Sequence, residues 1–443
     1  MNTRLSLRAA GWRAASVLLA SFCAFLWPAA AFAQTAASDS GPREFTIGIS
    51  EVGKRTIILD DFTAEEAIGE IADHARALHD IVERDLAYSA IFTVRRPPGP
   101  DASLAEQAAP VRGECIVSAK ISRGRRGFEL AGTLTEPRTS RRIASYSYEF
   151  DAATASLTAH RYADDIIFHL TGEEGIARTR IAFVGRNRDG QELYITDYDG
   201  ANTTRVTNDK SITISPDWSP DGGAILYTSF KRGNAAVYWI RPDATEGGAV
   251  AQHQGLNSAA AWAADGKRLA VALSKDGNQE IYTMRRDATS LTRLTVNKAI
   301  DTSPSWSPTG RQIVFTSDRT GSPQLFIMES DGSNQRRATF EGDYNASPAW
   351  SPDGQSIVYV SRTSSGFDLY MLDPVNQTTA PITRGRHLYE DPAWAPNGRQ
   401  IVATRNSGGA RSIVVMNADG SDERVLPSGG LDAFSPTWSP RLK

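Results

Sequence analysis

Hydrophobic and polar positions repeat along the C-terminal three-fifths of the chain with one fixed period. A tryptophan returns every 44 residues, and an aliphatic residue follows each of the first five tryptophans seven positions later. The tryptophans are Trp218, Trp262, Trp306, Trp350, Trp394 and Trp438. Because no insertion interrupts this period, the region is expected to consist of copies of one structural unit.

The apolar runs inside each unit are short and β-rich, and proline and glycine separate them. Examples are Ile357 to Val360 and Leu369 to Met371. These runs predict strands, because a helical repeat would need apolar runs of about ten residues or more at a 3.6-residue period. Ser351 to Gly354 predicts a tight turn, with proline at its first corner and glycine closing it. Each unit is therefore expected to be a four-stranded propeller blade.

The two ends of the repeat region complement each other. Ahead of Trp218 the chain holds the second, third and fourth strands of a unit, starting at Ile181, but no first strand. The missing first strand stands at the other end, over Phe434 to Trp438. We therefore predict an all-β six-bladed β-propeller over residues 173–443, whose composite closing blade removes exposed sheet edges.

A different pattern over residues 56–172 predicts a small α+β domain. An apolar stripe at helical spacing runs from Ile68 to Leu86, and Thr63 or Asp61 is the expected N-cap. Strands are expected on both sides of this helix, and a second helix is expected over residues 157–170. The two domains follow each other with only a short linker between them.

Residues 1–33 have the features of a secretory signal peptide. Three arginines precede an apolar stretch that is too short to span a bilayer, and Ala31 to Ala33 forms an A-x-A cleavage site. We expect cleavage between Ala33 and Gln34, and export. Residues 34–55 are then expected to form a flexible tail and an extended arm able to add to a sheet edge.

Composition places the chain among ordinary globular proteins, with 40% hydrophobic and 22% charged residues. The formal net charge is −3, and removing the three arginines of the signal peptide makes it −6. This mild acidity disfavours nucleic acid as a partner. Cleavage also leaves Cys115 as the single cysteine, which is expected to be a buried thiol rather than half of a disulfide.

The sequence shows no recognisable catalytic apparatus. It lacks a Gly-x-Ser-x-Gly motif, and its six histidines form neither an HExxH motif nor a pair four residues apart. No set of nucleophile, base and orienting residue can be named. We therefore predict no catalytic residues, no cofactor and no dedicated metal site.

Polar and acidic residues recur just before the first strand of several blades, where they would surround the mouth of the central channel. They are Asn257, Asp301, Asn345, Glu390, Asp391 and Asp432. Converging oxygen ligands could hold Ca²⁺, and Asn257, Asp301, Asn345 and Glu390 are the candidate ligands. Polar residues could also simply line a wet channel. A third interpretation is a protein-docking ring, because Leu256, Ile300, Tyr344 and Leu388 stand beside them.

Three segments carry a resemblance to a known family. The first joins Leu170–Gly172 to Ala177–Val184, the second is Asp197–Gly200, and the third runs from Arg84–Leu86 to Ile91–Phe92. Together with the signal peptide, the α+β domain and the six blades, they make the mature chain similar to the TolB family of the Tol-Pal envelope system. The Trp-Ser-Pro-Asp-Gly repeat alone is shared with many propellers.

The resemblance implies a monomeric, periplasmic, non-enzymatic scaffold without direct membrane insertion. Its implied partners are the peptidoglycan-associated lipoprotein Pal and the membrane-anchored protein TolA, in support of outer-membrane integrity and invagination during cell division. The implied TolA-binding arm includes Glu44, Phe45, Ile47 and Ile49. The implied Pal-binding ring comprises Leu256, Asn257, Ser258, Ala259, Ile300, Asp301, Thr302, Ser303, Tyr344, Asn345, Ala346, Leu388, Glu390 and Asp391. The alternative is a Ca²⁺-dependent periplasmic hydrolase with a channel metal.

Overall fold

The computed structural model describes residues 54–97 and 115–442, all of which belong to one compact unit, Phe45–Lys443. The expected signal peptide, its cleavage site and the residues Glu44, Phe45, Ile47 and Ile49 of the arm lie outside the described residues. Within the described residues, neither helix combines the length and the apolar character needed to cross a membrane.

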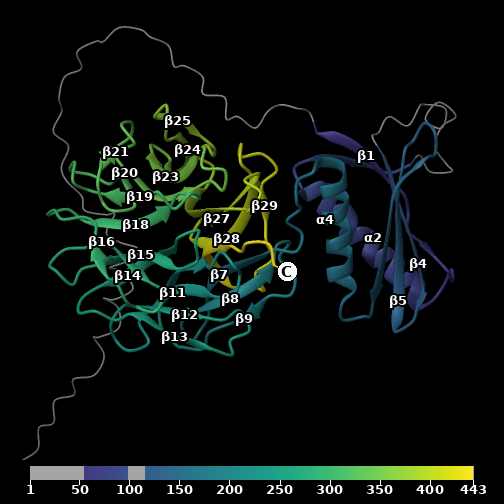
Figure 1. Cartoon of the computed structure of the whole chain (residues 1–443), viewed down its shortest axis with the longest axis horizontal. Coiled ribbons are helices and arrows are strands. Elements are labelled where there is room, and N and C mark those ends of the chain that lie inside the picture. The colour runs from purple at the N-terminus through teal and green to yellow at the C-terminus, as the bar shows by residue number, and fades with distance from the viewer. Residues whose placement is uncertain (1–53, 98–114, 443) are drawn as a thin grey trace, which may run out of the picture. The chain divides into compact units, whose positions relative to one another are not determined.

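The described residues of the α+β domain form one sheet and two helices (Figure 1). The sheet has the order β3-β1-β4-β5-β6, and the short β2 pairs with β4. β1 runs parallel to β3 and β4, whereas β4, β5 and β6 are antiparallel. The elements are β1 (Arg55–Leu59), β2 (Thr63–Ala64), α2 (Glu70–Tyr88), β3 (Phe92–Arg95), β4 (Ile116–Gly124), β5 (Gly127–Thr135), β6 (Arg142–Phe150) and α4 (Ala155–Thr171).

Alternation along the strands decides which face of this sheet is covered. In β4, Val117, Ala119 and Ile121 are buried, while the residues between them are more exposed. Both helices add apolar residues to the same core, among them Leu78 of α2 and Ile166 of α4. Cys115 is buried in this core as well, in agreement with the sequence-based expectation.

The first helix begins later than the sequence pattern predicts. Thr63 lies in β2 and pairs with β4, so it does not cap the helix. The N-cap is Gly69, whose φ of 101° suits glycine, and Ile68 is 87% exposed rather than part of the apolar stripe. The chain therefore uses Thr63 and Ala64 to extend the sheet. The predicted N-cap was wrong, and so was the prediction that Ile68 belongs to the apolar stripe.

The remaining strands form six four-stranded sheets, the blades of a propeller (Figure 1). The closing blade is β30 (Asp432–Trp438), β7 (Arg180–Arg186), β8 (Gln191–Asp197) and β9 (Thr204–Arg205). The others are β10 (Thr213–Trp218), β11 (Ile225–Ser229), β12 (Ala236–Ile240) and β13 (Gly247–Ala251); β14 (Asn257–Trp262), β15 (Arg268–Leu273), β16 (Glu280–Arg285) and β17 (Thr292–Arg293); β18 (Asp301–Trp306), β19 (Gln312–Ser317), β20 (Gln324–Glu329) and β21 (Arg336–Arg337); β22 (Asn345–Trp350), β23 (Ile357–Thr363), β24 (Gly366–Asp373) and β25 (Thr378–Pro381); and β26 (Leu388–Trp394), β27 (Gln400–Ser407), β28 (Ala410–Asn417) and β29 (Arg424–Val425).

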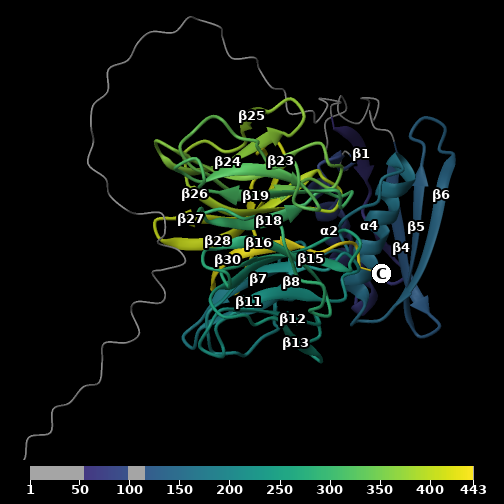
Figure 2. The same ribbon diagram turned by 60° about the vertical axis from the view of Figure 1, so that its left-hand side comes forward.

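The first strand of each blade, here called strand A, belongs to a closed ring. Strands A are β10, β14, β18, β22, β26 and β30. Each contacts the next one around the ring, and β30 contacts both β10 and β26. Figure 2 shows the blades from a second side. The six-bladed fold and its composite closing blade are therefore as predicted, with Trp438 of β30 paired to Ile181 of β7.

The periodic tryptophans pack between neighbouring blades. Trp262 of β14 shares a core with Leu226 and Val237 of the preceding blade, and it is 6% exposed. Trp306 repeats this arrangement against Ala270 and Ile281. The indole side chains thus stabilise the joints between blades by burying apolar surface, which explains their strict spacing.

A β-bulge interrupts every strand A at the same place. The bulged residue has a positive φ of about 50° and stands three residues before the tryptophan, and proline follows it in five blades. The six bulged residues are Ser215, Ala259, Ser303, Ser347, Asp391 and Ser435. The pairing register with the second strand shifts at each of them, so side chains on the two sides of a bulge do not follow one simple alternation.

Candidate functional site

The candidate site is the propeller face on which the strands A begin, called here the strand A face. Loops that lead from the fourth strand of one blade to the next strand A lie on this face, together with the loops between second and third strands. The turns between first and second strands, and between third and fourth strands, lie on the opposite face because neighbouring strands are antiparallel.

Three of the predicted ring residues are completely buried. Asn257, Asp301 and Asn345 occupy equivalent positions in three successive blades, and each is 0% exposed. The Asn257 side chain accepts the His253 N–H at 2.9 Å and donates to the Ala235 carbonyl at 3.0 Å. These side chains therefore hold loops together and do not line an open channel mouth, contrary to the expectation from the sequence.

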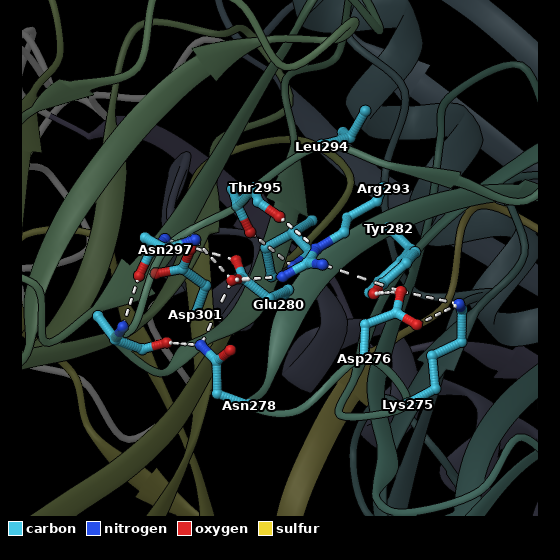
Figure 3. Close-up of polar contacts among 12 residues, drawn as sticks. Lys275, Asp276, Asn278, Glu280, Tyr282, Arg293, Leu294, Thr295, Asn297 and Asp301 are labelled. Atoms are coloured by element: carbon cyan, nitrogen blue, oxygen red, sulfur yellow. Dashed lines mark hydrogen bonds and ion pairs between the residues drawn. The ribbon is translucent and has the colours of Figure 1, made fainter.

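Asp301 anchors the most extensive of these networks (Figure 3). It accepts a hydrogen bond from Asn297 at 2.7 Å. A second hydrogen bond, from Arg319 at 2.8 Å, is not drawn in the close-up. Burial raises the pKa of Asp301, while Arg319 and Asn297 act in the opposite direction. The carboxylate consequently joins the loop after β17 to the loop between β19 and β20.

Glu280 is the second buried carboxylate of the same network (Figure 3). It accepts the Asn297 N–H at 2.7 Å and the Arg293 guanidinium at 3.0 Å. Burial alone would raise the pKa of Glu280, but these donors and the Thr295 hydroxyl lower it overall. Thr295 also accepts the backbone N–H of Ile281 at 2.9 Å, so it connects β16 to the residues that follow β17.

Other blades repeat this pair of residues, which we call the acid–threonine clamp. Thr207 donates to Glu192 at 2.6 Å, and Thr383 donates to Asp368 at 2.9 Å. Thr339 donates in the same way to Gln324, an amide in the acid position. Sequence reasoning missed this clamp, although an acid or amide and a threonine recur at its two positions, in step with the 44-residue period, in four of the six blades.

Apolar side chains on the same loops remain accessible. Leu256, Ile300, Tyr344 and Leu388 are half-buried at equivalent positions, one residue before strand A or at its start. Val296 and Phe340 are equivalent residues of neighbouring blades, and they are 75% and 60% exposed. The rings of Tyr344 and Phe367 meet edge to face at 5.4 Å. The strand A face thus presents apolar groups on loops that buried polar residues hold in place.

The remaining predicted ring residues lie at or beside the bulges. Ala259, Thr302, Ser303, Glu390 and Asp391 are half-buried, whereas Ser258 and Ala346 are buried. Burial and the neighbouring Asp391 charge raise the pKa of Glu390, and burial raises the pKa of Asp391. Asp432 instead pairs with Arg411 at 2.6 Å, which keeps its pKa low.

The acids of the strands A do not gather into a metal site. Among His, Cys, Asp and Glu of residues 54–97 and 115–442, only His79, Asp80 and Glu83 come close enough to share an ion, and these lie on α2. Of the expected Ca²⁺ ligands, Asn257, Asp301 and Asn345 are engaged within separate loops. The geometry therefore lends no support to the interpretation as a channel metal.

The structure brings two of the resembling segments into contact at a junction between α2 and the propeller. Tyr198, in the turn after β8, donates to Asp85 of α2, and Arg84 forms an ion pair with Asp199 at 2.5 Å. His160 of α4 contacts the other Asp85 oxygen at 2.6 Å. Asp85, His160 and Tyr198 are all nearly inaccessible to solvent.

Electrostatics at this junction favour a charged histidine. Burial alone would lower the pKa of His160, but the hydrogen bond and the charge of Asp85 raise it. Ser156 lies 3.1 Å from the other imidazole nitrogen, so both nitrogens have a partner. Although Ser156, His160 and Asp85 include the residue types of a hydrolytic triad, His160 is 3% exposed and its contacts explain a structural role.

The fold and the site define a six-bladed β-propeller with an N-terminal α+β domain and a face of ordered, partly apolar loops. The family described as TolB beta propeller domain matches residues 168–442. The chain therefore belongs to the TolB β-propeller family.

Comparisons with individual proteins agree with this assignment. A crystal structure of TolB from Acinetobacter baumannii superimposes with a TM-score of 0.77 at 28% identity, covering 87% of this chain and 97% of that one. The Tol-Pal system protein TolB of Anaeromyxobacter dehalogenans (strain 2CP-C) is 36% identical over 183 residues, which are 39% of this chain and 42% of that protein. The one of Legionella pneumophila (strain Corby) is 30% identical over 223 residues, 49% and 51% of the two chains. The stretches matched in these two Tol-Pal system proteins thus cover only about half of their length.

Proposed function

We propose that this protein is a non-enzymatic scaffold of the Tol-Pal system in the periplasm. It binds Pal through the strand A face and TolA through residues 44–55, and so supports outer-membrane integrity and invagination during division. Membership of the TolB β-propeller family and the Tol-Pal names of the relatives support this proposal.

One observation carries the assignment of the Pal surface. Leu256, Ile300, Tyr344 and Leu388 occupy equivalent positions around the ring, and Val296 and Phe340 project beside them. Apolar and aromatic residues within a polar rim are typical of protein-binding surfaces, and preformed loops lower the entropy cost of binding. The buried Asn257, Asp301 and Asn345 then support the surface without touching the partner.

Titration calorimetry of the mature protein against the soluble domain of its own Pal tests this assignment. We expect Phe340→Ala and Tyr344→Ala each to weaken binding at least tenfold, which corresponds to about 1.4 kcal/mol. Val375→Ala is the matched control, because Val375 is 85% exposed in the turn between β24 and β25 on the opposite face. Equal affinities for all three variants would refute the surface assignment.

The same titration with a chelator distinguishes the scaffold from the hydrolase alternative. Pal binding that is unchanged by the chelator supports the scaffold, whereas Pal binding that requires Ca²⁺ would favour a channel metal.

A truncated protein tests the TolA-binding arm. A protein lacking residues 34–53 should lose binding to TolA and keep its propeller intact. Undiminished TolA binding would exclude the arm as the contact.

A further inference from the structure

One turn of α2 gathers a histidine and two carboxylates on the α+β domain. His79, Asp80 and Glu83 each offer one ligand atom, and these atoms lie within 4.8 Å of one another. His79 and Glu83 are four residues apart and share one helix face, and Asp80 follows His79 directly. This arrangement, called here the α2 cluster, belongs neither to the strand A face nor to the junction with the propeller.

The imidazole of His79 is held in one orientation with an unused nitrogen. His79 is 5% exposed, and Phe62 packs edge-on against it with the ring centroids 5.3 Å apart. Nδ1 lies 3.4 Å from Asp80 Oδ1. Nε2 is buried and has no hydrogen-bond partner in the described residues, and it points toward Asp61 Oδ1 at 3.9 Å. A buried ring nitrogen without a partner is uncommon enough to require an explanation.

The surroundings of His79 carry excess negative charge. Arg96 forms two hydrogen bonds with Glu83, at 3.0 and 2.6 Å, which lower the pKa of Glu83. The charges of Asp61 and Asp80 act on the same guanidinium. Three carboxylates therefore share one arginine, and two negative charges remain for a further cation.

We propose that the α2 cluster binds a first-row transition cation of the zinc type. His79 Nδ1 and one oxygen from each of Asp80 and Glu83 are the protein ligands, and the fourth position is open to water. Imidazole with carboxylates suits Zn²⁺, whereas Ca²⁺ and Mg²⁺ prefer oxygen ligands only. Asp61 Oδ1, 3.9 Å from Nε2 of His79, would move closer to accept its N–H once the metal is bound, as outer carboxylates do for metal-bound histidines. Its exposed side chain is free to approach the ring.

Arg96 gives this site a distinctive property, because it competes with the metal for Glu83. Cation binding has to displace the guanidinium from at least one oxygen of Glu83. Removing Arg96 should therefore tighten metal binding, whereas a salt bridge that merely supports the helix predicts no such gain.

Calorimetric titration of the untagged mature protein with Zn²⁺ tests the proposal, with Ca²⁺ and Mg²⁺ as parallel probes. We expect one saturable Zn²⁺ site that Ca²⁺ and Mg²⁺ at equal concentration do not occupy. His79→Gln and Glu83→Gln should each weaken Zn²⁺ binding at least tenfold. Arg96→Gln, at a side chain that is 56% exposed, should strengthen it.

His74→Gln is the matched control. His74 also lies on α2 and also has a buried Nε2 without a hydrogen-bond partner in the described residues, but it packs against Phe128 and Phe150 rather than carboxylates. Zn²⁺ affinity unchanged in His74→Gln supports the site. Absence of a saturable site, equal losses in the His74 and His79 variants, or weaker binding in Arg96→Gln would each overturn it. Because Glu83 lies at the surface, its variant gives a readout that does not depend on the packing of His79.

Discussion

Buried or half-buried acids meet opposite surroundings in two regions of this protein. At the junction, Asp85 has His160 and Tyr198 as partners, and Arg84 pairs with Asp199. Along the strands A, Asp217, Glu390 and Asp391 take part in no ion pair within the described part of the chain. Asp217 accepts one hydrogen bond, from the Trp262 N–H at 2.7 Å, and burial raises its pKa to about 7.

The difference shows that burial alone does not decide what an acid contributes. A paired buried charge is costly to break, because removal of one partner leaves the other uncompensated. Burial raises the pKa of both Asp85 and Asp217, but Asp217 has no ion-pair partner among the described residues, so its ionised form destabilises the fold. Substitutions at the two regions should therefore change the stability in opposite directions.

The largest effect is expected from Asp85→Ala. It leaves His160 and the Tyr198 hydroxyl without their partner in a solvent-inaccessible place, so the free energy of unfolding should fall by about 3–5 kcal/mol. Chemical denaturation followed by circular dichroism measures this change. Asp73→Ala on the same helix is the control, since Asp73 is 71% exposed and should change the stability by less than about 1 kcal/mol. Similar losses in both variants would contradict the role assigned to the junction.

Periodicity explains why the propeller was predictable and parts of the site were not. A 44-residue repeat fixes the number of blades and the closing strand, because every copy reports the same unit. The same repeat placed Asn257, Asp301 and Asn345 at the start of their strands. The bulge that follows each of them breaks the alternation of buried and exposed side chains, so the sequence did not reveal that these three are buried.

The α+β domain lacks such repetition, and its errors have local causes. Gly69 starts α2 without a side-chain cap, so the usual signal of serine, threonine or aspartate was absent. The contact between Asp85 and Tyr198 joins residues 113 positions apart, and an aspartate and a tyrosine in a sequence do not by themselves indicate such a pair. Long-range pairing of this kind has no period that a single sequence could display.

A smaller effect of opposite sign is expected from Asp217→Asn. The folded-state pKa of about 7 lies above the ordinary value of 3.8, so Asp217 stabilises the fold at low pH and loses this contribution as the pH rises toward 7. The asparagine carbonyl can still accept the Trp262 N–H but cannot ionise. We expect a gain of about 2 kcal/mol at pH 8 and almost none at pH 4, after allowance for partial solvent screening. Thermal unfolding of the wild type and the variant at the two pH values measures this gain. A loss of stability at pH 8 would show instead that the ionised carboxylate stabilises the fold.

The smallest effect is expected near Glu280, an acid that has an ion-pair partner within its blade. It tests whether the pairing of an acid, rather than its place in the fold, decides if a substitution raises or lowers the stability. Thr295→Val removes the hydroxyl that accepts the Ile281 N–H and supports Glu280, while it preserves the shape of the side chain. The unfolding free energy should fall by about 1–2 kcal/mol, as for the loss of a buried hydrogen bond. Thr292→Val is the matched control, because Thr292 is exposed on β17, three residues before Thr295. If Thr295→Val were neutral, the clamp would not hold β16 to the residues after β17, and the contrast between paired and unpaired acids would apply to the junction alone.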